Sequence, residues 1–289
     1  MRFFKTLNKN CQNKRLFILL SITSLLLLFS CLDLDSFPDR PYLDNETLML
    51  AHRAGGDKPY GPFPENTYEA AVYGFAHADG IEVDVQKSLN GTLWLFHDSF
   101  LLECNGKDKN RIPEKTDEEI RSFMVCKGVE MATLEEILNY HRENSLNKII
   151  TLDVKSWLPS KNSYSTSYLT QVADKIAKLV KKYDMADYVI VECETALFLN
   201  RIRKNNKKIL CYLTTFGDLE EGATKALKAG YAGISFEYDV KNPPSIERIE
   251  KVKSKGIKIQ FWVINDKKDF ERALALKPEF IQTDNVLQQ

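Results

Sequence analysis

Short apolar runs rich in β-branched residues alternate with amphipathic segments from residue 48 to the end of the chain. The runs predict strands at 48–51, 81–85, 149–154, 188–191, 209–213, 233–236, 257–264 and 280–283. Apolar residues at i, i+3 and i+4 spacing predict helices at 67–78, 133–143, 168–183, 219–229, 245–255 and 267–276. Gly230 and Gly256 stand where helix ends favour a left-handed residue.

This alternation predicts a parallel sheet. Eight strands within about 240 residues fit one closed TIM (β/α)8 barrel over residues 48–289. A doubly wound open sheet is the alternative, but no glycine-rich fingerprint follows the first strand. Residues 93–132 fit the repeat least well. Residues 92–97 look like an extra strand or extended arm. Residues 99–127 form a polar segment outside the strand–helix repeat.

The first thirty residues have a different character. Residues 1–15 carry five basic side chains and no acid, and residues 16–30 are apolar or small. Fifteen residues are fewer than the roughly 20 that span a bilayer, so we predict a secretory signal peptide over 1–30. Its end, LFSC at 28–31, resembles a bacterial lipoprotein signal in which Cys31 is lipidated and becomes the new N-terminus.

An uncleaved membrane anchor is the alternative to the lipoprotein signal. Both interpretations export the body of the protein and attach it to a membrane, on the periplasmic or cell-surface side. Residues 32–47 are polar and contain two prolines and five acids, so we expect residues 31–47 to form a lipidated tether.

Charge and cysteine content narrow the function classes. The whole chain has 40 basic and 40 acidic residues, and removal of five basic residues with 1–30 leaves a net charge of −5. This balance argues against nucleic acid as a partner. Export makes a Cys104–Cys126 disulfide possible, whereas Cys193 and Cys211 fall in strand-like runs. No CxxC motif indicates a structural zinc site.

Charged residues gather where three of the predicted strands end. Period-two alternation places Glu82 and Asp84 on one face of their strand, and Asp153 and Lys155 on one face of the next. Active sites of TIM barrels form at these carboxyl ends. Lys155 and Arg53 could each form a salt bridge with one of these three acids. The third carboxylate would then have no cationic partner. Three carboxylates suit a hard divalent ion such as Mg2+ or Ca2+.

Two histidines flank the predicted carboxylates. His52 follows the first strand, and His97 follows an apolar arm. Histidine can give and take protons near neutral pH, and a metal ion with Arg53 and Lys155 can neutralise a phosphate. This inventory indicates phosphoryl chemistry by an exported, metal-dependent hydrolase. His77 and His141 lie in predicted helices, where surface or packing roles are expected.

Four motifs in order resemble the glycerophosphodiester phosphodiesterase family. They are HRAGG at 52–56, PENT at 64–67, EVDV at 82–85 and HD at 97–98. The similarity continues through 134–138, 153–155, 262–265 and 283–284, so it covers about residues 48–285.

The resemblance implies a TIM barrel that hydrolyses glycerophosphodiesters to glycerol 3-phosphate and an alcohol. It implies that His52 and His97 act as general base and general acid. The metal ligands would be Glu82, Asp84 and Asp153, and the phosphate or substrate contacts would be Arg53, Lys155, Glu65 and Trp262. The nucleophile would be either the glycerol hydroxyl of the substrate, through a cyclic phosphate, or water.

Three positions depart from the family pattern. Ala54 replaces the usual glycine, Asp153 replaces the usual glutamate, and the stretch after His97 and Asp98 lacks a common arginine–threonine pair. Two other functions therefore stay open. One is a phospholipase D of the sphingomyelinase D type, acting on intact lipids. The other is a non-catalytic barrel lipoprotein that serves as a binding module.

Overall fold

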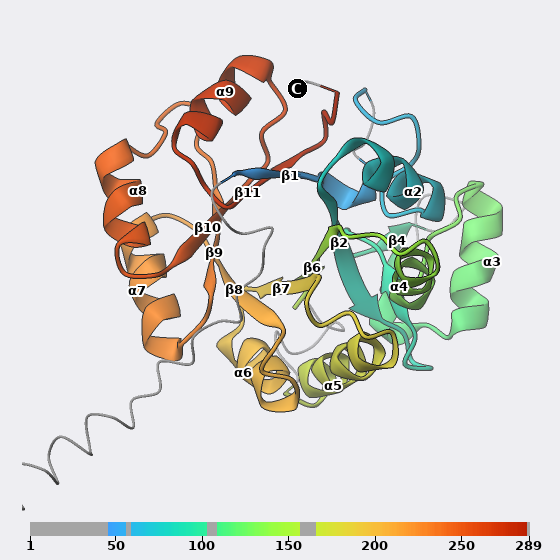
Figure 1. Ribbon diagram of the computed structural model, residues 1–289. Coiled ribbons are helices and arrows are strands. Elements are labelled where there is room, and N and C mark those ends of the chain that lie inside the picture. Colours follow the sequence, from blue (N-terminus) through green and yellow to red (C-terminus); the bar gives the residue numbers. More distant parts are fainter. Residues whose placement is uncertain (1–45, 56–58, 103–108, 157–165, 288–289) are drawn as a thin grey trace, which may run out of the picture. The chain divides into compact units, whose positions relative to one another are not determined.

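Eight parallel strands form a closed barrel in the computed structural model, which describes residues 46–55, 59–102, 109–156 and 166–287 (Figure 1). The barrel order is β1-β2-β6-β7-β8-β9-β10-β11, and β1 pairs with both β2 and β11. The strands are β1 (Leu48–Ala51), β2 (Gly80–Lys87), β6 (Ile149–Val154), β7 (Val189–Cys193), β8 (Leu210–Thr215), β9 (Gly233–Glu237), β10 (Lys258–Trp262) and β11 (Phe280–Thr283). The predicted TIM barrel is confirmed.

Helices cover the outside of the barrel (Figure 1). They are α2 (Tyr68–His77), α4 (Leu134–Glu143), α5 (Thr166–Lys182), α6 (Ala196–Asn205), α7 (Leu219–Ala229), α8 (Ile246–Lys253) and α9 (Lys267–Ala275). Side chains cap several of them, as where Thr133 and Glu136 form a capping box on α4. Gly230 ends α7 in the left-handed conformation, with φ 69°, as its position predicts.

The apolar pattern misses one helix of this ring. Only Phe198, Leu199 and Ile202 of α6 are buried, and a polar run of basic and amide side chains follows them. So short an apolar stripe gives little periodic signal. The other strands and helices of the barrel lie within a few residues of their predicted bounds.

Polar side chains fill the middle of the barrel. Gln282 on β11 donates to Glu192 on β7 at 3.0 Å, and Thr151 on β6 donates to Gln260 on β10 at 3.3 Å. These strands are not neighbours, so the bonds can only cross the interior. The alternate side chains face outward and form the apolar core with the helices, as Val83 and Phe261 do.

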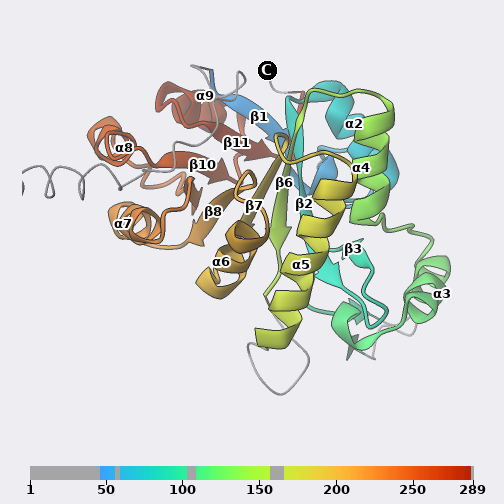
Figure 2. The ribbon, with the colours of Figure 1, turned by 60° about the horizontal axis from the view of Figure 1, so that its bottom comes forward.

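An insertion separates β2 from α4 and lies beyond the end of α4 (Figure 2). It comprises β3 (Leu93–Leu95), β4 (Leu101–Leu102), β5 (Lys109–Asn110), the 3-10 turn η3 (Ile112–Glu114) and α3 (Asp117–Lys127). The extended arm is confirmed as β3, which pairs antiparallel with β2. The polar segment 99–127 contains the helix α3. This helix forms there because Ile120 and Met124 provide enough apolar surface to pack on Trp94 and Ile112.

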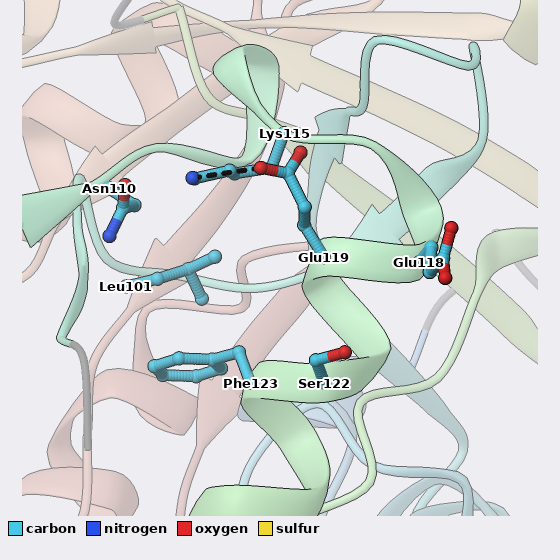
Figure 3. A pocket seen from close by; sticks show the side chains of 7 residues that line it. All are labelled: Leu101, Asn110, Lys115, Glu118, Glu119, Ser122 and Phe123. Carbon is cyan, nitrogen blue, oxygen red and sulfur yellow. Dashed lines mark hydrogen bonds and ion pairs between the residues drawn. The ribbon is translucent and has the colours of Figure 1, made fainter.

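The insertion has a cavity of its own, which is open to solvent and has a volume of about 420 Å³. Figure 3 shows its lining residues, which are Leu101, Asn110, Lys115, Glu118, Glu119, Ser122 and Phe123. Lys115 Nζ and Glu119 Oε1 form an ion pair of 3.1 Å beside it. None of the predicted site residues lines this cavity.

Some predictions concern residues that the structure does not describe. The signal peptide, Cys31 and nearly all of the tether lie outside the described residues, as do Cys104 and the side chain of Cys126. Cys193 and Cys211 are buried free thiols, in line with their place in strands. Within the described part of the chain, no helix combines the length and apolarity that crossing a bilayer requires.

Candidate active site

Three carboxylates converge at the end of the barrel where the strands finish, which we call the mouth. Glu82 and Asp84 come from β2, and Asp153 comes from the neighbouring strand β6. Asp84 and Asp153 are partners in the strand register. One oxygen of each carboxylate lies within 4.8 Å of the others. The structure therefore brings together the three acids whose alternation along two strands predicted a common face.

Lys155 joins two of these acids. Its Nζ lies 2.7 Å from Asp84 Oδ1 and 2.5 Å from Asp153 Oδ2. Burial alone would lower the pKa of Lys155, but Asp153 and Asp84 outweigh it and raise that pKa. Burial would likewise raise the pKa of Asp84, and the charge of Lys155 instead holds it below its usual value. Lys155 is therefore a permanent cation of the site.

Arg53 pairs most closely with Glu65 and makes only a long ion pair with an acid of this cluster, Asp84. Its guanidinium donates to Glu65 at 2.7 Å, and its Nε lies 4.0 Å from Asp84 Oδ2. The buried Nε has no hydrogen-bond acceptor within the described part of the chain. The left-handed backbone of Arg53, with φ 50°, instead lets its amide N donate to Glu82 Oε2 at 2.9 Å. The next residue, Ala54, is also left-handed, with φ 78°, which fits the family's usual glycine there.

Asn66 holds Asp84 in place and was not among the predicted site residues. Its Nδ2 donates to Asp84 Oδ2 at 2.8 Å, while its Oδ1 accepts from the backbone N of Asp84 at 3.1 Å. Asn66 has a φ of 58°, a conformation that asparagine tolerates better than most residues. Its place in the PENT motif was the available signal.

His52 is held from the side opposite the carboxylates. Its Nδ1 lies 2.8 Å from Asp284 Oδ1, and its Nε2 lies 3.8 Å from Glu82 Oε2. Asn265 Nδ2 donates to the other oxygen of Asp284 at 2.6 Å. Burial would raise the pKa of Asp284, but its hydrogen bond with His52 lowers it. Asp284 is thus an anion that fixes the ring of His52.

His97 stands in the segment between β3 and β4, and its side chain is 28% exposed. Its Nδ1 lies 2.9 Å from Asp98 Oδ1. Gln86 on β2 donates to the backbone oxygens of Phe96 and Asp98, at 2.8 and 2.9 Å, and ties this segment to the barrel. The backbone N of Phe96, the residue before His97, donates to the backbone oxygen of Asp84 at 3.0 Å, which brings this segment beside the strand that carries the acids.

The chain matches the family model described as Glycerophosphoryl diester phosphodiesterase family over residues 52–288. The chain belongs to this family. A glycerophosphodiester phosphodiesterase of Caldanaerobacter subterraneus subsp. tengcongensis is 25% identical over 249 residues, which cover 83% of this chain and 95% of the relative.

Solved structures of other family proteins share the fold of this glycerophosphodiester phosphodiesterase. The enzyme of Thermotoga maritima has a TM-score of 0.61 and 23% identity, over 83% of this chain and 96% of its own. A phosphodiesterase of Oleispira antarctica, solved with the product sn-glycerol-3-phosphate, has a TM-score of 0.67 and 16% identity, over 84% and 95%. Family membership makes the chain an enzyme of phosphodiester hydrolysis that acts on glycerophosphodiesters.

The acid cluster of this phosphodiesterase fits a divalent cation. Burial, and after it the charges of Asp84 and Asp153, raise the pKa of Glu82 well above its usual value. Three carboxylates face Lys155, while Arg53 pairs with Glu65. An excess of negative charge therefore remains, and the ligands are all oxygens, the kind that Mg2+ and Ca2+ prefer.

The sequence patterns missed a fourth acid, which lies on the strand next to Asp153. Glu192 on β7 is the register partner of Asp153 and is 3% exposed. It accepts hydrogen bonds from Gln260 and Gln282, and burial followed by the charge of Asp153 raises its pKa to about 8. An acid inside an apolar strand gave no separate signal, because only the closed barrel brings the two glutamines to it.

Trp262 lies at the end of β10, on the far side of the mouth from β2 and β6. Its ring contacts Phe216, with centroids 5.9 Å apart and planes at 83°. No hydrogen bond or ion pair with the acid cluster is among the described interactions of Trp262. The structure therefore places this predicted substrate contact at the mouth, on a strand that is not adjacent to those of the acid cluster.

Proposed function

We propose that this enzyme hydrolyses glycerophosphodiesters to glycerol 3-phosphate and an alcohol with one divalent ion, Mg2+ or Ca2+, and two histidines. The observation that carries the proposal is the convergence of Glu82, Asp84 and Asp153 within 4.8 Å, with His52 Nε2 at 3.8 Å from Glu82. The three acids would hold the ion. When bound, the ion would polarise an oxygen of the phosphate.

Two cations of the chain would share the charge of the phosphate. Lys155 is buried beside the acid cluster, and its raised pKa keeps it charged. The buried Nε of Arg53 has no acceptor within the described residues, while Glu65 orients the rest of its guanidinium. A phosphate oxygen would supply the missing acceptor. Fixed donors of this kind stabilise the charge that develops in the transition state.

The histidines would move protons through their Nε2 atoms. Nδ1 of His52 is engaged by Asp284, and Nδ1 of His97 by Asp98. With the proton on Nδ1, Nε2 of a neutral ring carries the lone pair of a base. We assign His52 as the base that deprotonates the nucleophile and His97 as the acid that protonates the leaving alkoxide.

The deciding experiment is coupled detection of glycerol 3-phosphate from glycerophosphocholine, with and without added divalent ion. Release that depends on the ion supports the proposal, and release by chelated enzyme at the same rate contradicts it. Lysophosphatidylcholine in a parallel arm tests the phospholipase D alternative. Free choline from that lipid, with none from glycerophosphocholine, would favour the alternative.

We also propose that residues 1–30 export the enzyme as a signal peptide and that lipidated Cys31 anchors it to a bacterial membrane. The basic start, the apolar run of fifteen residues and the LFSC sequence support this proposal. The barrel begins at Leu48, so residues 31–47 would link it to the lipid.

A further inference from the structure

Basic side chains gather at the end of the barrel opposite the mouth, where the helices finish and the strands begin. They belong to α6, α7, α8 and α9, which follow one another around one half of the barrel (Figure 1). The ends of these helices and the loops after them carry ten basic side chains and one acid, over residues 203–208, 228–230, 251–258 and 277–279. We call this surface the basic face. Its exposed lysines include Lys204, Lys228, Lys251, Lys255 and Lys277.

Interactions within the basic face join its segments and leave it positively charged. Arg203 at the end of α6 donates to the backbone oxygen of Ala229, the last residue of α7, at 2.6 Å. Lys253, the last residue of α8, forms an ion pair of 3.1 Å with Glu279 in the loop before β11. Glu279 is the one acid of the face, so this pair uses the only negative side chain that these segments provide.

The helix dipoles account for only part of this charge. The C-terminal end of a helix carries about half a negative charge, which a cation in the last turn offsets. Four cations stand at the end of α6, within 203–208, and four more at the end of α8, within 251–258. Like charges at this density repel one another. A negatively charged surface outside the protein would relieve that repulsion.

The same half of the barrel is acidic at the mouth. The segments that lead into α7, α8 and α9 carry eight acids and three basic side chains, over residues 216–221, 237–247 and 265–269. The helix α7 has eleven residues and is about 16 Å long, twice the Debye length of about 8 Å at physiological ionic strength. The cations of the basic face therefore attract an anionic surface beside them, while salt screens the distant acids.

The chain enters the barrel beside the basic face. The hydroxyl of Thr47, the residue before β1, donates to the backbone oxygen of Pro278 at 2.7 Å, and Pro278 follows Lys277 of the basic face. Residues 31–47 connect this point to the apolar run 16–30. Whether that run is a lipoprotein signal or an uncleaved anchor, it would attach the barrel to a membrane from the basic end.

We propose that the basic face binds the anionic lipid headgroups of this membrane and that the mouth opens away from the bilayer. Basic side chains close to an anionic leaflet are attracted by its negative surface potential. The inference rests on the proposed attachment of the chain to a membrane and adds the orientation of the barrel. In this orientation the mouth takes water-soluble diesters, of the kind left when lipids lose their acyl chains, from the aqueous side.

The first test labels lysines of the full chain, reconstituted in phosphatidylcholine vesicles with or without phosphatidylglycerol. Protein that sediments with the vesicles is treated with an amine-reactive reagent and analysed by mass spectrometry. Phosphatidylglycerol should lower the labelling of Lys228, Lys255 and Lys277 severalfold. Salt at about 1 M, where the Debye length is about 3 Å, should restore it. Lys241 and Lys268, exposed residues at the mouth, should label equally on both vesicles.

Two outcomes of this labelling would overturn the inference. One is labelling of the basic face that is the same with and without phosphatidylglycerol, because anionic headgroups would then have no part in covering it. The other is a loss of labelling at Lys241 and Lys268 on the anionic vesicles, because the mouth would then face the bilayer.

The double variant Lys204→Gln/Lys251→Gln removes two exposed cations from the basic face. It should reduce the protection of Lys277 by phosphatidylglycerol about twofold or more, because fewer charges hold the face on the anionic surface. The matched control Lys241→Gln/Lys268→Gln makes the same change of net charge at the mouth and should keep the protection. Equal protection of Lys277 in the two double variants would contradict the assignment of the basic face.

A separate measurement of acylation distinguishes this inference from the proposed lipid anchor. The mass of the N-terminal peptide of the same protein shows whether the lipid is present. A chain without the lipid whose basic face is still protected by phosphatidylglycerol supports the inference, while the proposed anchor fails. A lipidated chain without that protection keeps the anchor and overturns the inference.

Discussion

Asp284 Oδ1 lies 2.8 Å from Nδ1 of His52, although 232 residues separate them in the chain. β1 and β11 are hydrogen-bonded neighbours where the barrel closes, with Ala51 opposite Thr283. The residues that follow this pair are His52 and Asp284. Closure of the barrel thus supplies His52 with an anionic partner, and Asn265 holds that partner in turn.

Asp284→Asn should lower kcat for glycerophosphocholine by about 10²-fold, with a smaller change in KM. The amide can donate to Nδ1 and so favour the wrong tautomer, which leaves Nε2 protonated and unable to act as a base. Asp187→Asn changes an exposed aspartate and should have no effect. An Asp284→Asn enzyme with normal kcat would show that the hydrogen bond to His52 has no part in proton transfer.

His52→Ala and His97→Ala should each reduce turnover of glycerophosphocholine by roughly 10²-fold or more. The two differ on bis-p-nitrophenyl phosphate, whose nitrophenolate leaves without a proton. His97→Ala should lose much less activity on that compound, and His52→Ala should lose activity on both. If His97→Ala loses the same factor on both substrates, the role of general acid belongs elsewhere.

A chelator should inactivate the enzyme, and Mg2+ or Ca2+ should restore it. Asp153→Asn should weaken ion binding, measured by calorimetry, by more than about tenfold, because a neutral amide replaces a charged oxygen ligand. Asp153→Glu restores the residue usual in the family and provides the matched variant that should still bind the ion. Unaltered ion affinity in Asp153→Asn would remove this residue from the ligand set.

Glu192 should make the metal-free protein less stable as the pH rises. Its pKa is about 8 in the folded protein, against an ordinary value of 4.5, so the folded state holds a proton that the unfolded chain has lost between these pH values. The free energy of unfolding should therefore fall across that range. Urea unfolding at pH 5 and pH 8.5 measures the change, and Glu192→Gln should reduce it. If the free energy of unfolding depends on pH in the same way in the wild type and in Glu192→Gln, then Glu192 is not the source of this dependence.

Cys31→Ser should release the enzyme from membranes or leave the precursor uncleaved. The proposal of a lipoprotein signal at residues 28–31 requires the thiol of Cys31 as the site of acylation. Labelling with a radioactive fatty acid checks this outcome. Undiminished labelling of the Cys31→Ser protein would place the lipid on another residue.

The sequence by itself determined the fold and most of the acid cluster. Strand and helix periods repeat clearly enough to specify a (β/α)8 barrel, and a period of two along β2 and β6 sets Glu82, Asp84 and Asp153 on inner faces. The motifs at 52–56, 64–67, 82–85 and 97–98 pointed to the family that the comparison then established. These features are local, so neighbouring residues in the chain are enough to reveal them.

Only the tertiary structure decided which partners these residues take. The backbone amide of Arg53, which is left-handed, donates to Glu82, while its guanidinium donates to Glu65. Asp284 meets His52, and Glu192 meets Gln282, through strands that become neighbours or face one another only when the barrel closes. Hydrogen bonds and ion pairs depend on a few ångströms between residues distant in the chain, a quantity that no local pattern contains.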